Sequence, residues 1–182
     1  MEKIPLSNGF FLSSVTHNDK SALVTHLEAP EIAGNTLSIP YPYTESDAES
    51  WIEKRIAHRK SQPTEVTFAI RNPEGALIGA VGTGNFEIGS SHRAEVGYWL
   101  AKPYWGNGIT TNAVANYVPY AFDELNVVRL TAQVFAGNTA SARVLEKVGF
   151  TREGRLRSHR KKDGKLIDIL YYGMLRDDLE TS

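Results

Sequence analysis

The chain has 182 residues, of which 41% are hydrophobic and 23% are charged, and its formal net charge at pH 7 is −1. This length and composition predict one soluble domain over residues 1–182, with enough chain for a substantial core. The small net charge excludes a general attraction to nucleic acid or to an anionic membrane. The absence of cysteine excludes disulfides, thiolate metal sites and a cysteine nucleophile. The first residues carry no long apolar run, so we expect a cytoplasmic protein without signal peptide or membrane span.

The first half of the chain is expected to form short helices followed by a strand hairpin. A possible cap at residues 17–19 precedes a helix, and the pattern Thr44-x-x-Asp47 resembles a capping box ahead of a second helix. The prolines and glycine between these helices favour irregular structure. The expected elements are a strand at 10–15, a helix at 20–27, an irregular segment at 28–43, a helix at 48–60, and strands at 66–71 and 76–83 joined by a turn at 72–75.

The second half alternates strands and helices, which predicts a mixed sheet with helices packed on it. Pro119 is expected to kink its helix or to end it early, and Gly149 is well placed as a helix C-cap. The residues Lys162-Asp163-Gly164 predict a hairpin turn. The expected elements are strands at 94–100, 128–135, 150–159 and 166–175, a helix from Asn107 or Thr110 to 125, and a helix at 139–148.

The most informative segment runs from Tyr98 to Thr111, where a strand ends, a Gly-x-Gly loop follows and a helix begins. This order places unpaired backbone N–H groups and the positive end of a helix dipole beside the end of a strand. Such a place binds a phosphate or pyrophosphate without a Lys or Arg, and glycine lets the backbone approach the anion closely. The segment therefore predicts a phosphorylated cofactor, with a plain strand–helix turn as the alternative.

Two motifs resemble the cofactor signatures of the GNAT acetyltransferase superfamily, in the form found in its RimJ/RimL-like branch. The first motif is Trp105-Gly106-Asn107-Gly108-Ile109-Thr110-Thr111, and the second runs from Asn138 to Phe150. Two spaced motifs in the right order rarely coincide by chance. The resemblance covers residues 10–175, and it implies an α/β fold with a splayed central mixed sheet flanked by helices. It also implies the transfer of an acetyl group from acetyl-CoA to an amine.

The resemblance assigns cofactor contacts residue by residue. The pyrophosphate would lie on the N–H groups from Gly106 to Thr111, and the pantetheine arm would pair with the backbone at Leu100 and Ala101. Asn138 would contact that arm and cap its helix, while Arg143 would reach a phosphate or the adenine. An ordinary paired strand, a plain cap and a solvated arginine are the alternatives. The cofactor set is Leu100, Ala101, Trp105, Gly106, Asn107, Gly108, Ile109, Thr110, Thr111, Asn138 and Arg143, with no metal.

Two positions depart from the superfamily pattern. Thr110 is larger than the usual Gly or Ala, which alters the approach of the helix to the pyrophosphate. Leu145 stands where many relatives have a tyrosine that protonates the leaving thiolate. By resemblance, Ser141 then hydrogen-bonds the sulfur and serves as general acid, whereas a helical Ser otherwise bonds its own backbone or solvent.

Glu95 is the best candidate for the general base. In an alternating strand it shares a face with Gly97 and Trp99, and its carboxylate can reach the amine directly or through a water. The alternative is a surface carboxylate paired with Arg93 or Lys102. Weaker substitutes for the base are His92, His159 and Asp168.

The acceptor is the least defined part of the prediction. Tyr41, Tyr43 and Trp51 are candidates for a substrate pocket, although aromatic residues more often pack in a core. The leading acceptor is a protein N-terminal α-amine, by resemblance to RimJ/RimL-like enzymes, and the alternative is a small amine such as a polyamine, amino sugar or drug. A non-catalytic acyl-CoA-binding module is the rival of a different class. A monomer and a homodimer are both compatible with the sequence. The last hairpin is basic, either as solvated surface or to meet a CoA phosphate or an acidic substrate.

Overall fold

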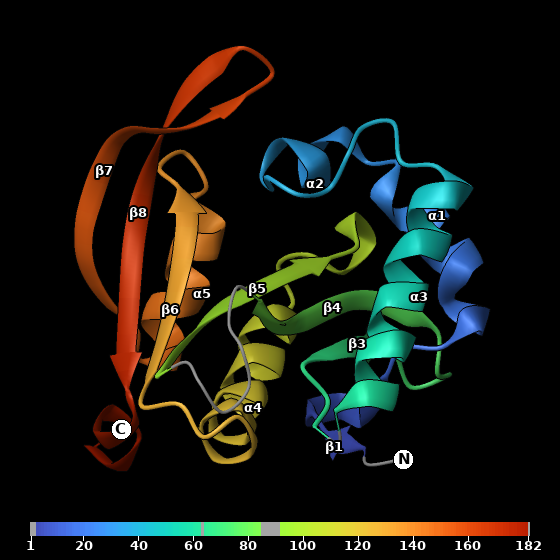
Figure 1. Ribbon diagram of the computed structural model, residues 1–182, viewed down its shortest axis with the longest axis horizontal. Coiled ribbons are helices and arrows are strands. Elements are labelled where there is room, and N and C mark those ends of the chain that lie inside the picture. Colours follow the sequence, from blue (N-terminus) through green and yellow to red (C-terminus); the bar gives the residue numbers. More distant parts are fainter. Residues whose placement is uncertain (1–2, 63, 85–91, 182) are drawn as a thin grey trace. The chain divides into compact units, whose positions relative to one another are not determined.

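The structure is a computed structural model that describes residues 3–62, 64–84 and 92–181. The chain divides into two compact units, the first formed by Met1–Gly82 with Tyr98–Asn116 and the second by Thr83–Gly97 with Tyr117–Ser182. Strands β4 (Leu77–Gly84) and β5 (Arg93–Leu100) and helix α4 (Ile109–Glu124) each contribute residues to both units. Figure 1 shows the course of the chain.

The first unit is an antiparallel sheet with helices on it. Its strands follow the order β1-β2-β3-β4, and each neighbouring pair is antiparallel. Helices α1 and α3 lie side by side (Figure 1), and their apolar side chains form the core with Val15, Ala69 and Leu77. The elements are β1 (Ile4–Pro5), β2 (Phe11–Ser14), α1 (Lys20–Leu27), α2 (Pro30–Gly34), α3 (Glu45–Ser61) and β3 (Thr67–Arg71), with β4 after them.

The helix ends of this unit follow from local chemistry. The capping box expected at Thr44 and Asp47 is confirmed: the Thr44 hydroxyl accepts from the Asp47 N–H at 3.2 Å, and the Asp47 carboxylate accepts from the Thr44 N–H at 2.8 Å. The helix therefore starts at Glu45, earlier than predicted. Helix α2 lies within the segment predicted to be irregular, because Pro30 is at its start, where the fixed φ of proline favours a helix.

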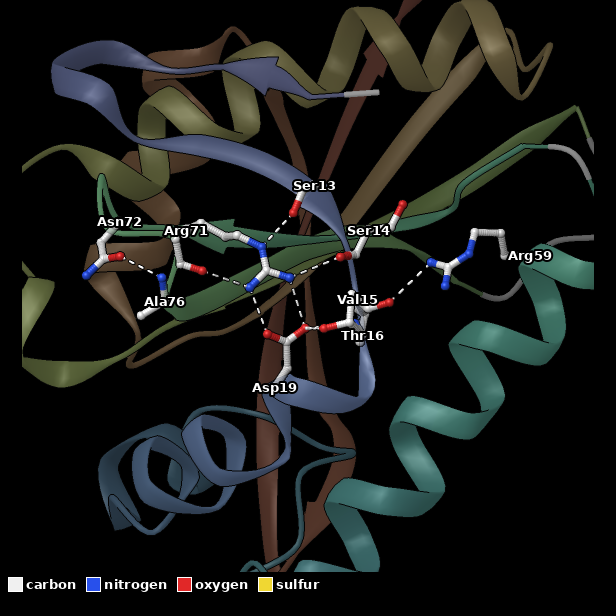
Figure 2. Close-up of polar contacts among 10 residues, drawn as sticks. Ser13, Ser14, Val15, Thr16, Asp19, Arg59, Arg71, Asn72 and Ala76 are labelled. Carbon is white, nitrogen blue, oxygen red and sulfur yellow. Dashed lines mark hydrogen bonds and ion pairs between the residues drawn. The ribbon is translucent and has the colours of Figure 1, made fainter. Parts of the chain in front are cut away.

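A buried ion pair joins β2, β3 and the turn before α1 (Figure 2). Arg71 donates to both carboxylate oxygens of Asp19, at 2.7 and 2.9 Å, and to Ser13 Oγ and the Ser14 and Gly75 carbonyls. All five N–H donors of the guanidinium are thereby engaged. Both side chains are more than 90% buried, and removing one partner of such a pair typically costs about 3–5 kcal/mol. This cluster stabilises the fold, and sequence inspection did not find it.

The second unit is a mixed sheet in the order β5-β6-β8-β7, with β5 and β6 parallel and the other pairs antiparallel. Asn138 caps α5 by accepting from the Ser141 N–H at 3.1 Å, and Gly149 ends that helix in the left-handed conformation, as predicted. Pro119 lies inside α4, which continues to Glu124, so the early end allowed for at Pro119 does not occur. The further elements are β6 (Arg129–Phe135), α5 (Thr139–Val148), β7 (Thr151–Lys162) and β8 (Lys165–Leu175). The fold is mixed α/β with helices flanking the strands, as the sequence predicts.

Strand β7 contains a wide bulge. Leu156 stands opposite Ile169 and Arg160 stands opposite Ile167, so the residues between Leu156 and Arg160 face Asp168 alone. Ser158 has a positive φ of 49°, and its N–H donates to Asp168 at 2.8 Å. Arg155 donates to the same carboxylate at 2.8 Å. The Ser158 N–H and then the Arg155 side chain hold the pKa of Asp168 below its usual range, so the carboxylate that supports the bulge stays ionised.

Candidate functional site

The loop before α4 has the backbone of an anion site. Gly106 and Gly108 have φ values of +79° and +73°, and a Cβ at either would meet no atom within 4 Å. The first helical hydrogen bond runs from the Asn112 N–H to the Gly108 carbonyl at 3.0 Å. The N–H groups of residues 109–111 therefore lie ahead of the helical ladder, at the positive end of the helix dipole. The open space at the glycines and the N–H groups ahead of the helical ladder are what a pyrophosphate requires.

Side chains of the loop fix its conformation. The Trp105 indole N–H donates to the Leu100 carbonyl at 2.7 Å, which connects the loop to the end of β5. The Asn107 amide donates to the Tyr104 and Trp105 carbonyls at 3.3 and 3.2 Å. Ile109 is buried, whereas residues 105–108 are exposed. The loop is thus held from its own residues while its glycines remain accessible.

The backbone at Leu100 and Ala101 is more fully engaged than the sequence predicts. The Ala101 N–H donates to the Ile78 carbonyl at 2.8 Å, and the Ala101 carbonyl accepts from the Tyr104 N–H at 3.0 Å. The Leu100 carbonyl accepts from Trp105. A Cβ on Gly79 would lie 2.5 Å from the Trp99 carbonyl oxygen, so β4 and β5 approach closely here. Pairing of a cofactor arm with Ala101 would therefore have to share or displace existing hydrogen bonds.

In the second unit Glu95 belongs to a row of polar side chains. Its Oε2 accepts from Gln133 Nε2 at 3.1 Å, and Gln133 Oε1 accepts from Arg160 Nη2 at 3.0 Å. The alternative partners weighed for Glu95 have other contacts: Arg93 donates to the Tyr171 hydroxyl at 3.3 Å, and Lys102 pairs with Glu31. Sequence reasoning placed Arg160 only in the basic last hairpin and connected neither Gln133 nor Arg160 with Glu95, because only the strand register brings them together. The β5–β6 register, with Glu95 opposite Thr131, is the signal that would have found Gln133.

Helix α5 holds two further candidates, Ser141 and Arg143, and Asn138 caps it. Ser141 is partly buried in the first turn, where its N–H is bonded to the Asn138 side chain. Arg143 is exposed, and Leu145 has no exposed surface. The position that carries a tyrosine in many relatives is therefore a core position here. Asn138 is confirmed as a cap, while its contact with a cofactor stays a prediction.

The three aromatic residues predicted to line a substrate pocket differ in their surroundings. Tyr41 is 60% exposed, whereas Tyr43 is 7% exposed and belongs to the core of the first unit. Burial raises the pKa of Tyr43 to about 12, with Asp47 adding to the rise. Trp51 packs against the same core and stacks under the Arg55 guanidinium, 5.6 Å from the ring centre. Tyr43 is thus a packing residue, and Tyr41 is the most accessible of the three.

The weaker candidates for the general base lie on the surface or beside the β7 bulge. His92 and His159 are exposed, and Asp168 supports the β7 bulge. Across residues 3–62, 64–84 and 92–181, no three His, Asp or Glu side chains gather as a metal ion would require. Within the same residues, no helix has the length and apolar character needed to cross a membrane.

Comparison with known proteins shows a family match and a shared fold. The sequence profile of the acetyltransferase (GNAT) domain matches residues 10–151, a stretch that runs through both units. YdaF of Bacillus subtilis (strain 168), provisionally named a ribosomal N-acetyltransferase, is 36% identical over 107 residues, which are 59% of this chain and 58% of YdaF. The chain spans about half the length of the curated relatives it matches.

Two solved structures share the fold. RimL, a ribosomal L7/L12 alpha-N-protein acetyltransferase solved with coenzyme A, superposes with a TM-score of 0.85 at 18% identity, over 97% of this chain and 99% of RimL. RimJ of Mycobacterium smegmatis, solved with CoA-disulfide, gives 0.80 at 24% identity, over 98% and 88% of the two chains. At these identities the likeness is one of fold. The profile match over residues 10–151 shows the family: the chain belongs to the GNAT acetyltransferase family.

Proposed function

We propose that this chain is an acetyl-CoA-dependent N-acetyltransferase that acts on a primary amine by direct attack in a ternary complex. The observation that carries the proposal is the loop before α4, where two positive-φ glycines open the backbone ahead of three N–H groups at a helix start. An exposed, preformed anion site of this kind suits the pyrophosphate of CoA. The family match runs through both units, which supports their working as one catalytic domain.

The residues of this chain take separate roles in the proposed reaction. The loop from Trp105 to Thr111 holds the pyrophosphate, and acetyl-CoA supplies an activated acetyl thioester. Glu95 accepts the proton that the amine nitrogen loses as its bond to the acetyl carbon forms, directly or through a water. The Ser141 hydroxyl donates a hydrogen bond to the departing sulfur, and water supplies the proton that makes it a thiol. No covalent intermediate on the protein is required, and the chain has no cysteine.

We further propose a protein N-terminal α-amine as the acceptor. The support is the ribosomal N-acetyltransferase name given to YdaF and the alpha-N-protein acetyltransferase activity of RimL. An exposed aromatic side chain such as Tyr41 offers a surface on which an extended peptide can lie.

Thiol release from acetyl-CoA tests this proposal with a mixed panel of acceptors. The panel contains short peptides with free N-termini, the same peptides with blocked N-termini, and small amines including polyamines and amino sugars. We expect release that requires an unblocked peptide. Release with small amines alone would contradict the peptide acceptor, and acetyl-CoA binding without release from any member would contradict the enzymatic function.

A further inference from the structure

The row of polar side chains across β5, β6 and β7 connects Glu95 to a positive charge through a neutral amide. Gln133 lies two residues beyond Thr131, which stands opposite Glu95 in the parallel β5–β6 pair. Gln133 Nε2 donates to Glu95 at 3.1 Å, and Arg160 Nη2 donates to Gln133 Oε1 at 3.0 Å. All three side chains are partly buried, so solvent only partly screens their interactions.

The direction of these hydrogen bonds follows from chemistry. A guanidinium can only donate, so the oxygen of the Gln133 amide must face Arg160. The amide nitrogen then faces Glu95 and can only donate, so the Glu95 oxygen in this bond must accept. The Arg160 charge thereby orients the amide without ambiguity. One carboxylate oxygen, Oε2, is held as an acceptor, and this bond fixes the orientation of the carboxylate.

The bulge in β7 is what brings Arg160 to this row. Between the pairs Leu156–Ile169 and Arg160–Ile167, β7 advances four residues while β8 advances two. The two extra residues set which β7 side chain stands opposite Ile167, and bulges commonly re-aim a side chain in this way. Arg160 Nε is buried and has no hydrogen-bond partner within the described part of the chain. The guanidinium contacts Gln133 through Nη2.

We propose that Gln133 and Arg160 are positioning residues that orient the Glu95 carboxylate for proton abstraction. The proposal rests on the proposed function, in which Glu95 is the general base. Neither residue is required to touch the substrate or acetyl-CoA. Their effect is therefore transmitted only through Glu95, and this restriction makes the proposal testable by a double-mutant cycle.

The cycle combines Gln133→Leu with Glu95→Gln, and Arg160→Met replaces Gln133→Leu in a parallel cycle. In the parent, we expect Gln133→Leu to lower kcat by about 10-fold to 100-fold, the scale of one hydrogen bond to a charged group, with KM for acetyl-CoA unchanged. We expect Arg160→Met to lower kcat less, and neither substitution to lower kcat further in the Glu95→Gln protein. Arg152→Met, which removes an exposed arginine elsewhere on β7, is the control and should leave kcat at the parental value.

The outcomes separate this inference from the proposed function. Parental kcat in Glu95→Gln would remove Glu95 as the base and overturn both. Reduced kcat in Glu95→Gln, together with equal losses from Gln133→Leu in both backgrounds, would leave the base in place and overturn the positioning role. Parental kcat in Gln133→Leu would do the same. Melting temperatures of all variants identify any that fail to fold, and the Arg160→Met cycle then decides alone.

Discussion

The loop before α4 and the polar row around Glu95 use different parts of the chain for their chemistry. In the loop, the proposed contact with the pyrophosphate is made by backbone N–H groups, and the loop is one run of residues from Trp105 to Thr111. In the row, side chains of β5, β6 and β7 hydrogen-bond to one another, and they are brought together by the register of the strands. The comparison predicts that changes in the loop affect cofactor binding, whereas changes in the row affect turnover.

Glu95→Gln gives the largest expected effect on turnover. The substitution removes the proton acceptor and keeps the shape of the side chain, so we expect kcat to fall by about 10²–10⁴-fold. Acetyl-CoA affinity should hardly change, because Glu95 is not part of the loop. Steady-state kinetics and calorimetric titration with acetyl-CoA measure the two quantities separately. Parental turnover in Glu95→Gln would show that Glu95 is not the general base.

Ser141→Ala should have a smaller effect. A serine hydroxyl is a weak acid, so its contribution is a hydrogen bond to the leaving sulfur, and we expect a loss of about 10-fold to 100-fold in kcat. The cap of α5 should survive, because Asn138 accepts from the Ser141 backbone N–H, which alanine keeps. A melting temperature equal to that of the parent checks this point. Parental turnover under conditions where chemistry limits the rate would show that the hydroxyl has no part in the reaction.

Asp168→Asn tests the bulge that carries Arg160, and we expect only a small loss of thermal stability. The pKa of Asp168 is held below its usual range by the Ser158 N–H and by Arg155. Because the folded pKa lies below the unfolded one, the stabilisation is present above the ordinary carboxyl pKa of about 3.9 and is lost as pH falls through the folded pKa. The parent should therefore melt at a higher temperature than Asp168→Asn at pH 7, by a margin that shrinks at pH 3. An equal margin at both pH values would contradict this account.

Local signals explain what the sequence could predict. Helix α1 has the predicted bounds, and the Thr44 and Asn138 caps and the Gly149 end are as expected, because each depends on a few adjacent residues. Helix α4 was predicted to run to residue 125 and ends at Glu124, so the early end allowed for at Pro119 does not occur. The proline removes a hydrogen bond to the carbonyl of Ala115, and both residues are exposed, so water can satisfy that carbonyl and the helix continues.

Contacts between distant residues explain what the sequence could not predict. Arg71 and Asp19 are 52 residues apart, and Gln133 lies 38 residues from Glu95. Neither pair can be recognised from the sequence, because each contact depends on how distant segments pack in the fold. The loop motif predicted an anion site, yet the bond from the Trp105 indole to the Leu100 carbonyl was not foreseen. It occupies a backbone group that the cofactor was expected to use.

The central claim is that the loop before α4 binds acetyl-CoA, and calorimetric titration of Gly108→Glu tests it most directly. Gly75→Glu is the matched control, since Gly75 also has a positive φ with open space around its Cα and belongs to the same unit. Both substitutions impose similar backbone strain, but only Gly108→Glu places a bulky carboxylate where the pyrophosphate is expected. We predict that Gly108→Glu no longer binds acetyl-CoA while Gly75→Glu binds it as the parent does. Parental affinity in a folded Gly108→Glu protein would contradict the account.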